Sequence, residues 1–126
     1  MKKWIVITCI TIAIQSCSNS DDDQPVVCTE EFRTVGVTVT GGQFDNFYTV
    51  RKTTNDTIRH NPIIGGTLAD FYPILDDNYQ AQLANSEDTF TFHGFLANQL
   101  LLKEDYIIKA DQCHIELVSG QTEIEL

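Results

Sequence analysis

Positive charge is the scarcest property of this sequence. Its 126 residues include eight lysine and arginine residues against eighteen aspartate and glutamate residues, a formal net charge of -10 at pH 7. Without Lys2 and Lys3 the balance is six basic against eighteen acidic residues, or -12. Such a charge repels phosphate backbones, so we expect the protein not to bind nucleic acid.

Long apolar runs and tryptophan are also scarce. The uncharged stretch Trp4 to Ile14 covers eleven residues, too few for a helix that spans a bilayer. Trp4 is the sole tryptophan, so the rest of the chain has no indole ring on which a sugar could stack. At 42% hydrophobic and 10% aromatic residues, however, the chain is too apolar for a disordered acidic tail, and we expect one small folded domain.

Spacings typical of catalytic or metal sites are missing as well. His60, His93 and His114 are scattered, so they predict surface histidines and not a zinc site. Asp76, Asp77 and Asn78 lack the spacing of a calcium-binding loop and predict a turn, although the sequence leaves a weak calcium site open. No nucleophile lies at a useful spacing from a base, so we expect neither a cofactor nor an enzymatic activity.

The first sixteen residues have the pattern of a bacterial signal peptide. Met1 to Lys3 is a positive segment, and Trp4 to Ile14 is an uncharged one of suitable length. The following residues, Ile14, Gln15, Ser16 and Cys17, place a small residue directly before a cysteine. They resemble the lipobox of bacterial lipoproteins. That resemblance implies that Cys17 is lipidated and that residues 1–16 are removed.

The segment after Cys17 is polar and acidic. Residues 17–25 are expected to be the lipidated cysteine and an extended tether, because like charges repel one another. Asp21, Asp22 and Asp23 resemble the acidic export signal of surface-displayed lipoproteins, with a generic polar linker as the alternative. The expected location is therefore the outer membrane, anchored by lipid, with the cell surface and the periplasmic face both open.

Residues 26–126 alternate between apolar and polar side chains, which is the period of a half-buried strand. Turn residues interrupt this alternation at short intervals, as at Gly41 with Gly42 and at Ser119 with Gly120. Pro73 restricts its segment to a sheet edge or a strand start. The pattern predicts an all-β sandwich. The expected strand segments are Val35–Val39, Tyr48–Val50, Phe71–Leu75, Tyr79–Leu83, Phe90–Phe92, Leu100–Leu102, Tyr106–Ala110, Cys113–Leu117 and Thr122–Leu126, with loops at His60–Thr67 and Gly94–Gln99.

The C-terminal run from Tyr106 to Leu126, with Asp111, Gln112, Cys113 and His114 followed by Ser119 and Gly120, resembles small bacterial lipoproteins that carry a transthyretin-like or carboxypeptidase-regulatory-like domain. The resemblance implies a seven-stranded, antiparallel Greek-key sandwich of the Ig-like or transthyretin-like kind. For function it implies little beyond an accessory or carbohydrate-facing module.

Two of the four cysteines remain for the folded domain. Cys9 lies in the signal peptide and Cys17 in the lipobox, so Cys28 and Cys113 are left in an oxidising compartment and are predicted to form a disulfide. The rival interpretation is a nucleophilic Cys113 with His114 as its base. Adjacent residues on a strand point to opposite faces, so a structural cysteine is favoured.

Five aromatic residues are candidates for either the core or a binding patch, and core is favoured. They are Phe44, Phe47, Tyr48, Phe71 and Tyr72. Two hypotheses for function follow. The first is a membrane-tethered, non-enzymatic module that binds a protein or carbohydrate of the envelope. The second is a periplasmic inhibitor or immunity-type lipoprotein that blocks a lytic enzyme.

Overall fold

The computed structural model describes residues 25–61 and 70–126. The predicted signal peptide, Cys17 and Asp21, Asp22 and Asp23 lie outside the described residues, as does most of the expected crossover at His60–Thr67. In the described ranges, no helix is long and apolar enough to cross a membrane.

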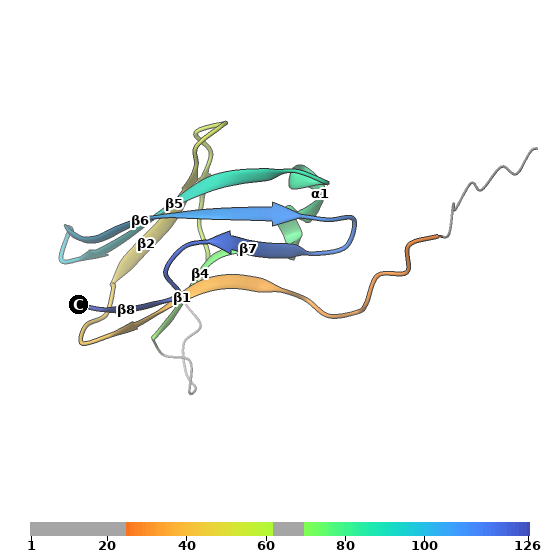
Figure 1. Cartoon of the computed structure of the whole chain (residues 1–126). Helices are drawn as coiled ribbons and strands as arrows, with labels where there is room; N and C mark the ends of the chain where they lie inside the picture. Colours follow the sequence, from red (N-terminus) through yellow and green to blue (C-terminus); the bar gives the residue numbers. More distant parts are fainter. Residues whose placement is uncertain (1–24, 62–69) are drawn as a thin grey trace, which may run out of the picture.

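The described residues form two β-sheets, which face each other (Figure 1). One sheet has three strands in the order β4-β1-β8, and the other has five in the order β3-β2-β5-β6-β7. The bounds are β1 Thr34–Thr40, β2 Asn46–Arg51, β3 Thr57–Ile58, β4 Phe71–Asp76, β5 Glu87–Leu96, β6 Gln99–Ala110, β7 Ile115–Ser119 and β8 Glu123–Glu125, with helix α1 at Gln80–Leu83.

This architecture confirms the all-β prediction and corrects two of its details. The described residues contain eight strands and not seven. The sheets are not wholly antiparallel either, because β8 runs parallel to β1, with Val39 opposite Ile124. The last short alternating run therefore adds an edge strand to the smaller sheet. The other edge strand of this sheet is β4, which contains Pro73. This agrees with the restriction of proline to edge strands.

The segment Tyr79 to Leu83 is helical, and its prediction as a strand is wrong. Asp77–Tyr79 forms a single 3-10 turn that leads into α1. The Asp76 carboxylate begins this turn by accepting a hydrogen bond from the backbone N–H of Asn78 at 2.9 Å. Leu83 is buried, whereas Ala81 is exposed. Residues 79 and 83 share one helical face. Apolar residues four positions apart fit a helix as well as a strand, and Ala81 between them made the segment resemble a strand.

The expected loop at Gly94–Gln99 is also much shorter in the structure. Strand β5 continues to Leu96 and β6 begins at Gln99, so only Ala97 and Asn98 form the turn. Both have positive φ angles, 48° and 63°, as a tight two-residue hairpin requires. The Asp45 carboxylate holds this turn by accepting from the backbone N–H of Ala97 at 2.7 Å.

The core lies between the two sheets and confirms most of the aromatic prediction. Phe44, Phe47 and Tyr72 are buried, and their ring centroids lie 5.9 to 6.5 Å from that of Phe92. Gly94 makes room for this cluster, because a Cβ atom there would lie 2.6 Å from the Phe44 ring. Tyr48 and Phe71 are only partly buried. The other core residues are Val37, Val39, Ile58, Ile74, Leu75, Leu83, Phe90, Tyr106, Ile108, Ala110 and Ile115.

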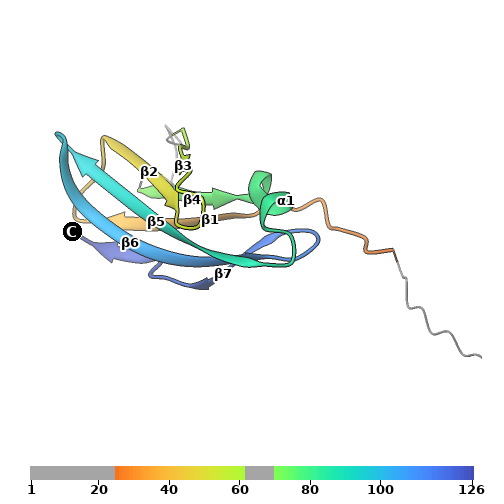
Figure 2. The same cartoon turned by 90° about the horizontal axis from the view of Figure 1, so that it is seen from above.

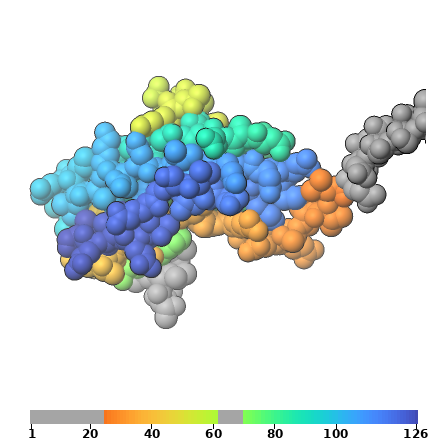
Figure 3. Space-filling model, viewed as in Figure 1, coloured from red at the N-terminus to blue at the C-terminus, as the bar shows by residue number. Residues whose placement is uncertain are grey.

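The two ends of the sandwich carry different features. The N-terminal segment that starts at residue 25 reaches the domain beside α1 and the β6–β7 turn (Figures 1 and 2). The β5–β6 hairpin and the C-terminus lie at the opposite end in both views. In the space-filling view, this hairpin (light blue) projects away from the N-terminal segment (orange; Figure 3). The tip of the hairpin and the described start of the chain at residue 25 therefore lie at opposite ends of the sandwich.

One core side chain is poorly matched to its surroundings and provides a test of the fold. Thr49 of β2 is fully buried, and its hydroxyl has no hydrogen-bond partner in the described structure. Replacing it in the variant Thr49→Val keeps the shape and removes the unsatisfied group, so we expect unfolding to become about 1 kcal/mol less favourable. Chemical denaturation measures this change, with Thr49→Ser as the control that keeps the hydroxyl. A destabilised Thr49→Val variant would contradict the described burial.

Candidate functional site

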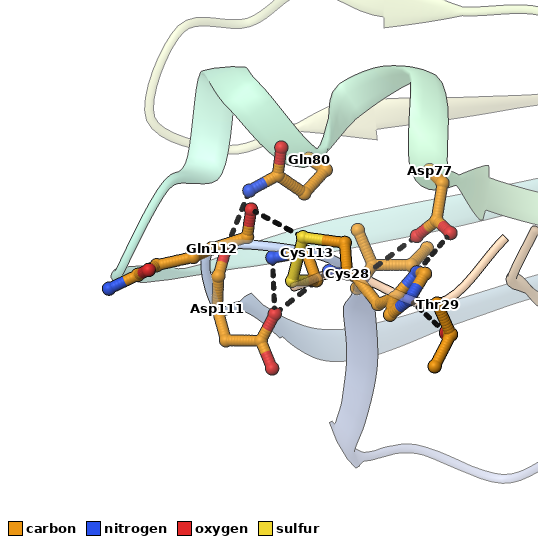
Figure 4. Close-up of a disulfide and its surroundings, with 9 residues drawn as sticks. Cys28, Thr29, Asp77, Gln80, Asp111, Gln112 and Cys113 are labelled. Atoms are coloured by element: carbon orange, nitrogen blue, oxygen red, sulfur yellow. Dashed lines mark hydrogen bonds and ion pairs between the residues drawn. A yellow bond between two sulfur atoms is a disulfide. The ribbon is translucent and has the colours of Figure 1, made fainter. Parts of the chain in front are cut away.

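The structure contains the predicted disulfide between Cys28 and Cys113, with Cα atoms 5.3 Å apart (Figure 4). Neither cysteine lies on a strand, so the expectation for Cys113 is corrected: Cys28 precedes β1, and Cys113 lies in the turn before β7. The bond closes a separation of 85 residues, which stabilises the domain by about 4.5 kcal/mol on the chain-entropy model. A bonded Cys113 offers no thiolate, so the structure argues against the reactive-cysteine interpretation.

The carboxylate of Asp77 lies beside this disulfide and joins three segments. It accepts hydrogen bonds from the backbone N–H groups of Arg33 and Ile115 and from Nδ1 of His114, each at 2.8 Å. The backbone N–H of Asp77 in turn donates to the carbonyl of Arg33 at 3.0 Å. One side chain at the start of the helical turn thus connects the segment before β1 to the start of β7.

His114 is buried in this cluster, so its prediction as a surface histidine is wrong. The side chains of His114 and Asp77 are each only 9% exposed. Because Nδ1 faces a carboxylate, Nδ1 carries the proton, and Nε2 accepts from the Thr29 hydroxyl at 2.9 Å. Thr29, His114 and Asp77 form a hydroxyl–imidazole–carboxylate chain. Figure 4 shows Thr29 and Asp77 close to the disulfide.

The pKa values of two carboxyl groups reflect these hydrogen bonds. Burial alone would raise the pKa of Asp77, but the bonds from Arg33, Ile115 and His114 lower it below its usual value. The pKa of Asp111 is also lowered, because its carboxylate accepts from the backbone N–H groups of His114 and Cys113. Both groups therefore favour the charged form, which holds the disulfide turn in place.

We interpret this cluster as a strap for the N-terminal segment. A chain of hydroxyl, imidazole and carboxylate is also the arrangement of hydrolytic triads. In such triads, N–H groups must point at the oxyanion of the substrate. Here the N–H groups of Arg33, Cys113, His114 and Ile115 point at the carboxylates of Asp77 and Asp111 instead. These hydrogen bonds thus have a structural role: they hold the segment before β1 against the turn before β7.

The outer face of the five-stranded sheet carries a different arrangement, which we call the cationic row. It consists of Tyr48, His93 and Lys103 at neighbouring positions on β2, β5 and β6, together with Arg59, which directly follows β3. Tyr48 pairs with His93 in register, and His93 pairs with Lys103. The Tyr48 and His93 rings are stacked with centroids 4.9 Å apart, and the Arg59 guanidinium lies 5.1 Å from the centre of the Tyr48 ring.

The two cations of this row differ from the other basic residues that the structure describes. The other four lysine and arginine residues in the described ranges form ion pairs: Arg33 with Glu31, Arg51 with Asp88, Lys52 with Asp105 and Lys109 with Glu116. Arg59 and Lys103 have no carboxylate within 4.0 Å in the same residues. The sequence of residues 62–69 also contains no acidic residue. Among residues 25–61 and 70–126, the two cations without an ion-pair partner thus both belong to the row that contains the stacked Tyr48 and His93 rings.

An open groove of about 400 Å³ adjoins the cationic row. Its lining combines apolar, hydroxyl and charged groups, contributed by Val50, Lys52, Thr91, His93, Lys103 and Asp105. Burial lowers the pKa of His93, so its imidazole is neutral at pH 7. The Nδ1 atom of His93 lies 3.2 Å from the Thr91 carbonyl, and a proton on Nδ1 leaves Nε2 as an acceptor.

The residues considered for a metal site have other partners. The carboxylates of Asp76 and Asp77 accept from N–H groups and form a helical turn, in place of the expected simple turn. His60 lies 3.2 Å from the Ile74 carbonyl, while His93 and His114 belong to separate regions. In residues 25–61 and 70–126, no three His, Cys, Asp or Glu side chains converge as metal ligands would.

Sequence reasoning missed both the strap and the cationic row. Asp77, His114 and Thr29 are far apart in sequence, and the turn predicted at Asp76 to Asn78 did not indicate which segments the Asp77 carboxylate would contact. The row had a partial signal, because Tyr48 was among the five aromatic residues considered for a binding patch. Arg59 and Lys103 gave no signal, since only the structure identifies which basic residues are paired.

The strap predicts a loss of stability at low pH. A carboxyl group with a lowered pKa contributes stability above its unfolded value near 3.9 and loses it as the pH falls through the folded value. In Asp77→Asn, an NH₂ group faces N–H donors, so we expect a cost of about 1–3 kcal/mol at pH 7 and a weaker pH dependence below pH 4. Urea unfolding between pH 2 and 7 measures both effects. Equal losses in Glu125→Gln, which changes an exposed carboxylate, would contradict the role of the strap.

Comparison with known proteins found no family model, no curated protein and no solved structure that matches the chain.

Proposed function

We propose that this protein is a lipid-anchored, non-enzymatic module that binds a component of the bacterial envelope through the outer face of its five-stranded sheet. The observation that supports it most is the cationic row, because Arg59 and Lys103 lack acidic partners in the described residues of a strongly acidic chain. An unpaired cation beside an open groove remains available to a ligand. The lipobox resemblance at Cys17 supplies the anchor of the proposal.

The strap at the N-terminal end supports a tethered role. The disulfide and Asp77 fasten the segment that follows the expected tether to the domain. The cationic row lies elsewhere, on the outer face of the five-stranded sheet, where Arg59 and Lys103 are exposed. The Ig-like or transthyretin-like subclass and the surface or periplasmic location remain predictions of the sequence.

The second candidate function, an inhibitor of a lytic enzyme, has one structural observation in its favour. The β5–β6 hairpin projects from the end opposite the N-terminal segment (Figure 1). Leu96, Leu100 and Leu101 near its tip are 38 to 45% exposed. The hairpin tip is apolar, and Asp45 fixes its turn through the Ala97 N–H group. Such a tip could insert into the cleft of another protein. We keep this function as the alternative.

The anchor is tested by removing its thiol. In cells that express the chain with Cys17→Ser, we expect an unlipidated precursor that partitions into the aqueous phase of a detergent separation. The unchanged chain should partition with the detergent, because it carries acyl chains. Equal partition of both proteins into detergent would mean that the apolar segment Trp4 to Ile14 is the anchor, and the lipobox interpretation would be wrong. Cys9→Ser is the matched control.

The binding face is tested with the same released protein. We expect Cys17→Ser protein to bind isolated envelopes in a saturable way, and we expect Lys103→Glu to weaken this binding at least about tenfold, because attraction becomes repulsion. Lys109→Glu, on the same strand but paired with Glu116, should bind nearly normally. Sedimentation with the envelopes measures the bound fraction. Unchanged binding of Lys103→Glu together with loss in Leu100→Ser would overturn the proposed face and favour the hairpin tip.

A further inference from the structure

We propose that the cationic row and its adjoining groove bind an acidic polysaccharide, a polymer of sugar units that carry carboxylate groups. This inference rests on the proposed function, because it names the ligand class of the same face. It is carried by the spacing and pairing of the two cations, by the orientation of the two rings between them, and by the position of the groove in the middle of the sheet.

The spacing of the cations favours a polymer with well-separated charges. Arg59 directly follows β3 and Lys103 lies on β6, and β2 and β5 lie between these strands. Three strand spacings of about 4.8 Å place their backbones on the order of 15 Å apart. A nucleic acid carries one charge per about 1.7 Å and is bound by many cations. Two cations at this separation can each pair with a different carboxylate along an acidic polymer, without needing a charge at every position between them. The distant carboxylates of the domain are screened beyond about 8 Å at physiological salt.

The pairing of Lys52 limits what else the groove can accept. Its ammonium group is held by Asp105, which also accepts from the Thr91 hydroxyl at 2.6 Å. The hydrogen bonds that Lys52 and Thr91 donate to Asp105 lower the pKa of its carboxyl group and favour its charged form. This fixed carboxylate next to the row disfavours a densely anionic ligand, whereas it can accept hydrogen bonds from sugar hydroxyl groups.

The orientation of the rings favours hydrogen bonding across their edges. The Tyr48 ring is stacked against His93 on β5 and also against Phe95, with centroids 4.9 and 5.6 Å apart, and Arg59 covers it as well. The faces of the Tyr48 ring are therefore in contact with other side chains of the protein and are not free for a ligand. The Tyr48 hydroxyl and His93 Nε2 have no hydrogen-bond partner among residues 25–61 and 70–126. These two groups offer a donor and an acceptor to a ligand rich in hydroxyl groups.

The position of the groove disfavours a peptide. A peptide that adds a strand to a sheet needs a free edge, and the edges of this sheet are β3 and β7. The row crosses β2, β5 and β6, whose backbones already pair with their neighbours. A protein partner would also need a buried apolar anchor, and the large apolar side chain nearest the row, Phe95, is stacked on Tyr48. Sugar units are the polymer that this surface fits better.

The test measures binding of the full chain, kept in neutral detergent, to polygalacturonate by isothermal titration calorimetry. Poly-L-glutamate serves as the acidic polypeptide and pullulan as the neutral polysaccharide. We expect binding of polygalacturonate that weakens with added salt, and little binding of the other two polymers. Arg59→Gln and Lys103→Gln should each weaken binding about fivefold, while Lys109→Gln should leave it unchanged.

Several results would overturn the inference. These are stronger binding of poly-L-glutamate, equal binding of pullulan, or equal weakening by Lys109→Gln. Thermal unfolding of each variant tests whether misfolding causes a loss of binding. Arg59, Lys103 and Lys109 are exposed, so we expect the variants to fold normally. If polygalacturonate fails to bind while Lys103→Glu still reduces sedimentation with envelopes, the ligand class is wrong and the proposed face stands. If neither assay responds to the row, both proposals fail.

Discussion

The carboxylate of Asp77 accepts hydrogen bonds from residues 44 positions before it and 38 positions after it. Through these bonds, the segment before β1, the helical turn after β4 and the beginning of β7 share one buried group. The nearby disulfide adds a covalent link between two of the same three segments. Together they fix one end of the sandwich, and the two sheets extend from this end toward the free β5–β6 hairpin (Figure 2). The core packs between two sheets whose relative position at this end is set by these bonds.

The sequence contained enough information for the fold class and for the disulfide. Alternation of apolar and polar residues reports which face of a strand is buried, and two remaining cysteines in an oxidising compartment leave a single pairing. The register and the helical turn could not be read in this way. Tyr79, Ala81 and Leu83 satisfy both a period of two and, through their outer members, a spacing of four. Only the cap by Asp76 decides between them.

The candidate site was less accessible to sequence reasoning, for a related physical reason. Whether a charged side chain is available to a ligand depends on its distance to opposite charges, and these distances are set by the packing of strands that are remote in sequence. Arg51 and Lys52 are adjacent, yet they pair with Asp88 and Asp105 on two different strands. Pairing of this kind leaves Arg59 and Lys103 unpaired among the described residues. A net charge of -12 for residues 17–126 suggests a wholly acidic surface, which the sheet contradicts locally.

The position of Cys28 also determines how the domain responds to a mechanical load. A pulling force that enters through residue 25 reaches Cys28 before it reaches β1, which begins at Thr34. There the covalent bond carries the force to Cys113 and into the turn between β6 and β7. Strand β1 is therefore not peeled from β4 and β8 one hydrogen bond at a time. The load bypasses the edge of β1 and enters the five-stranded sheet through β6 and β7, the strands that the Cys113 turn connects.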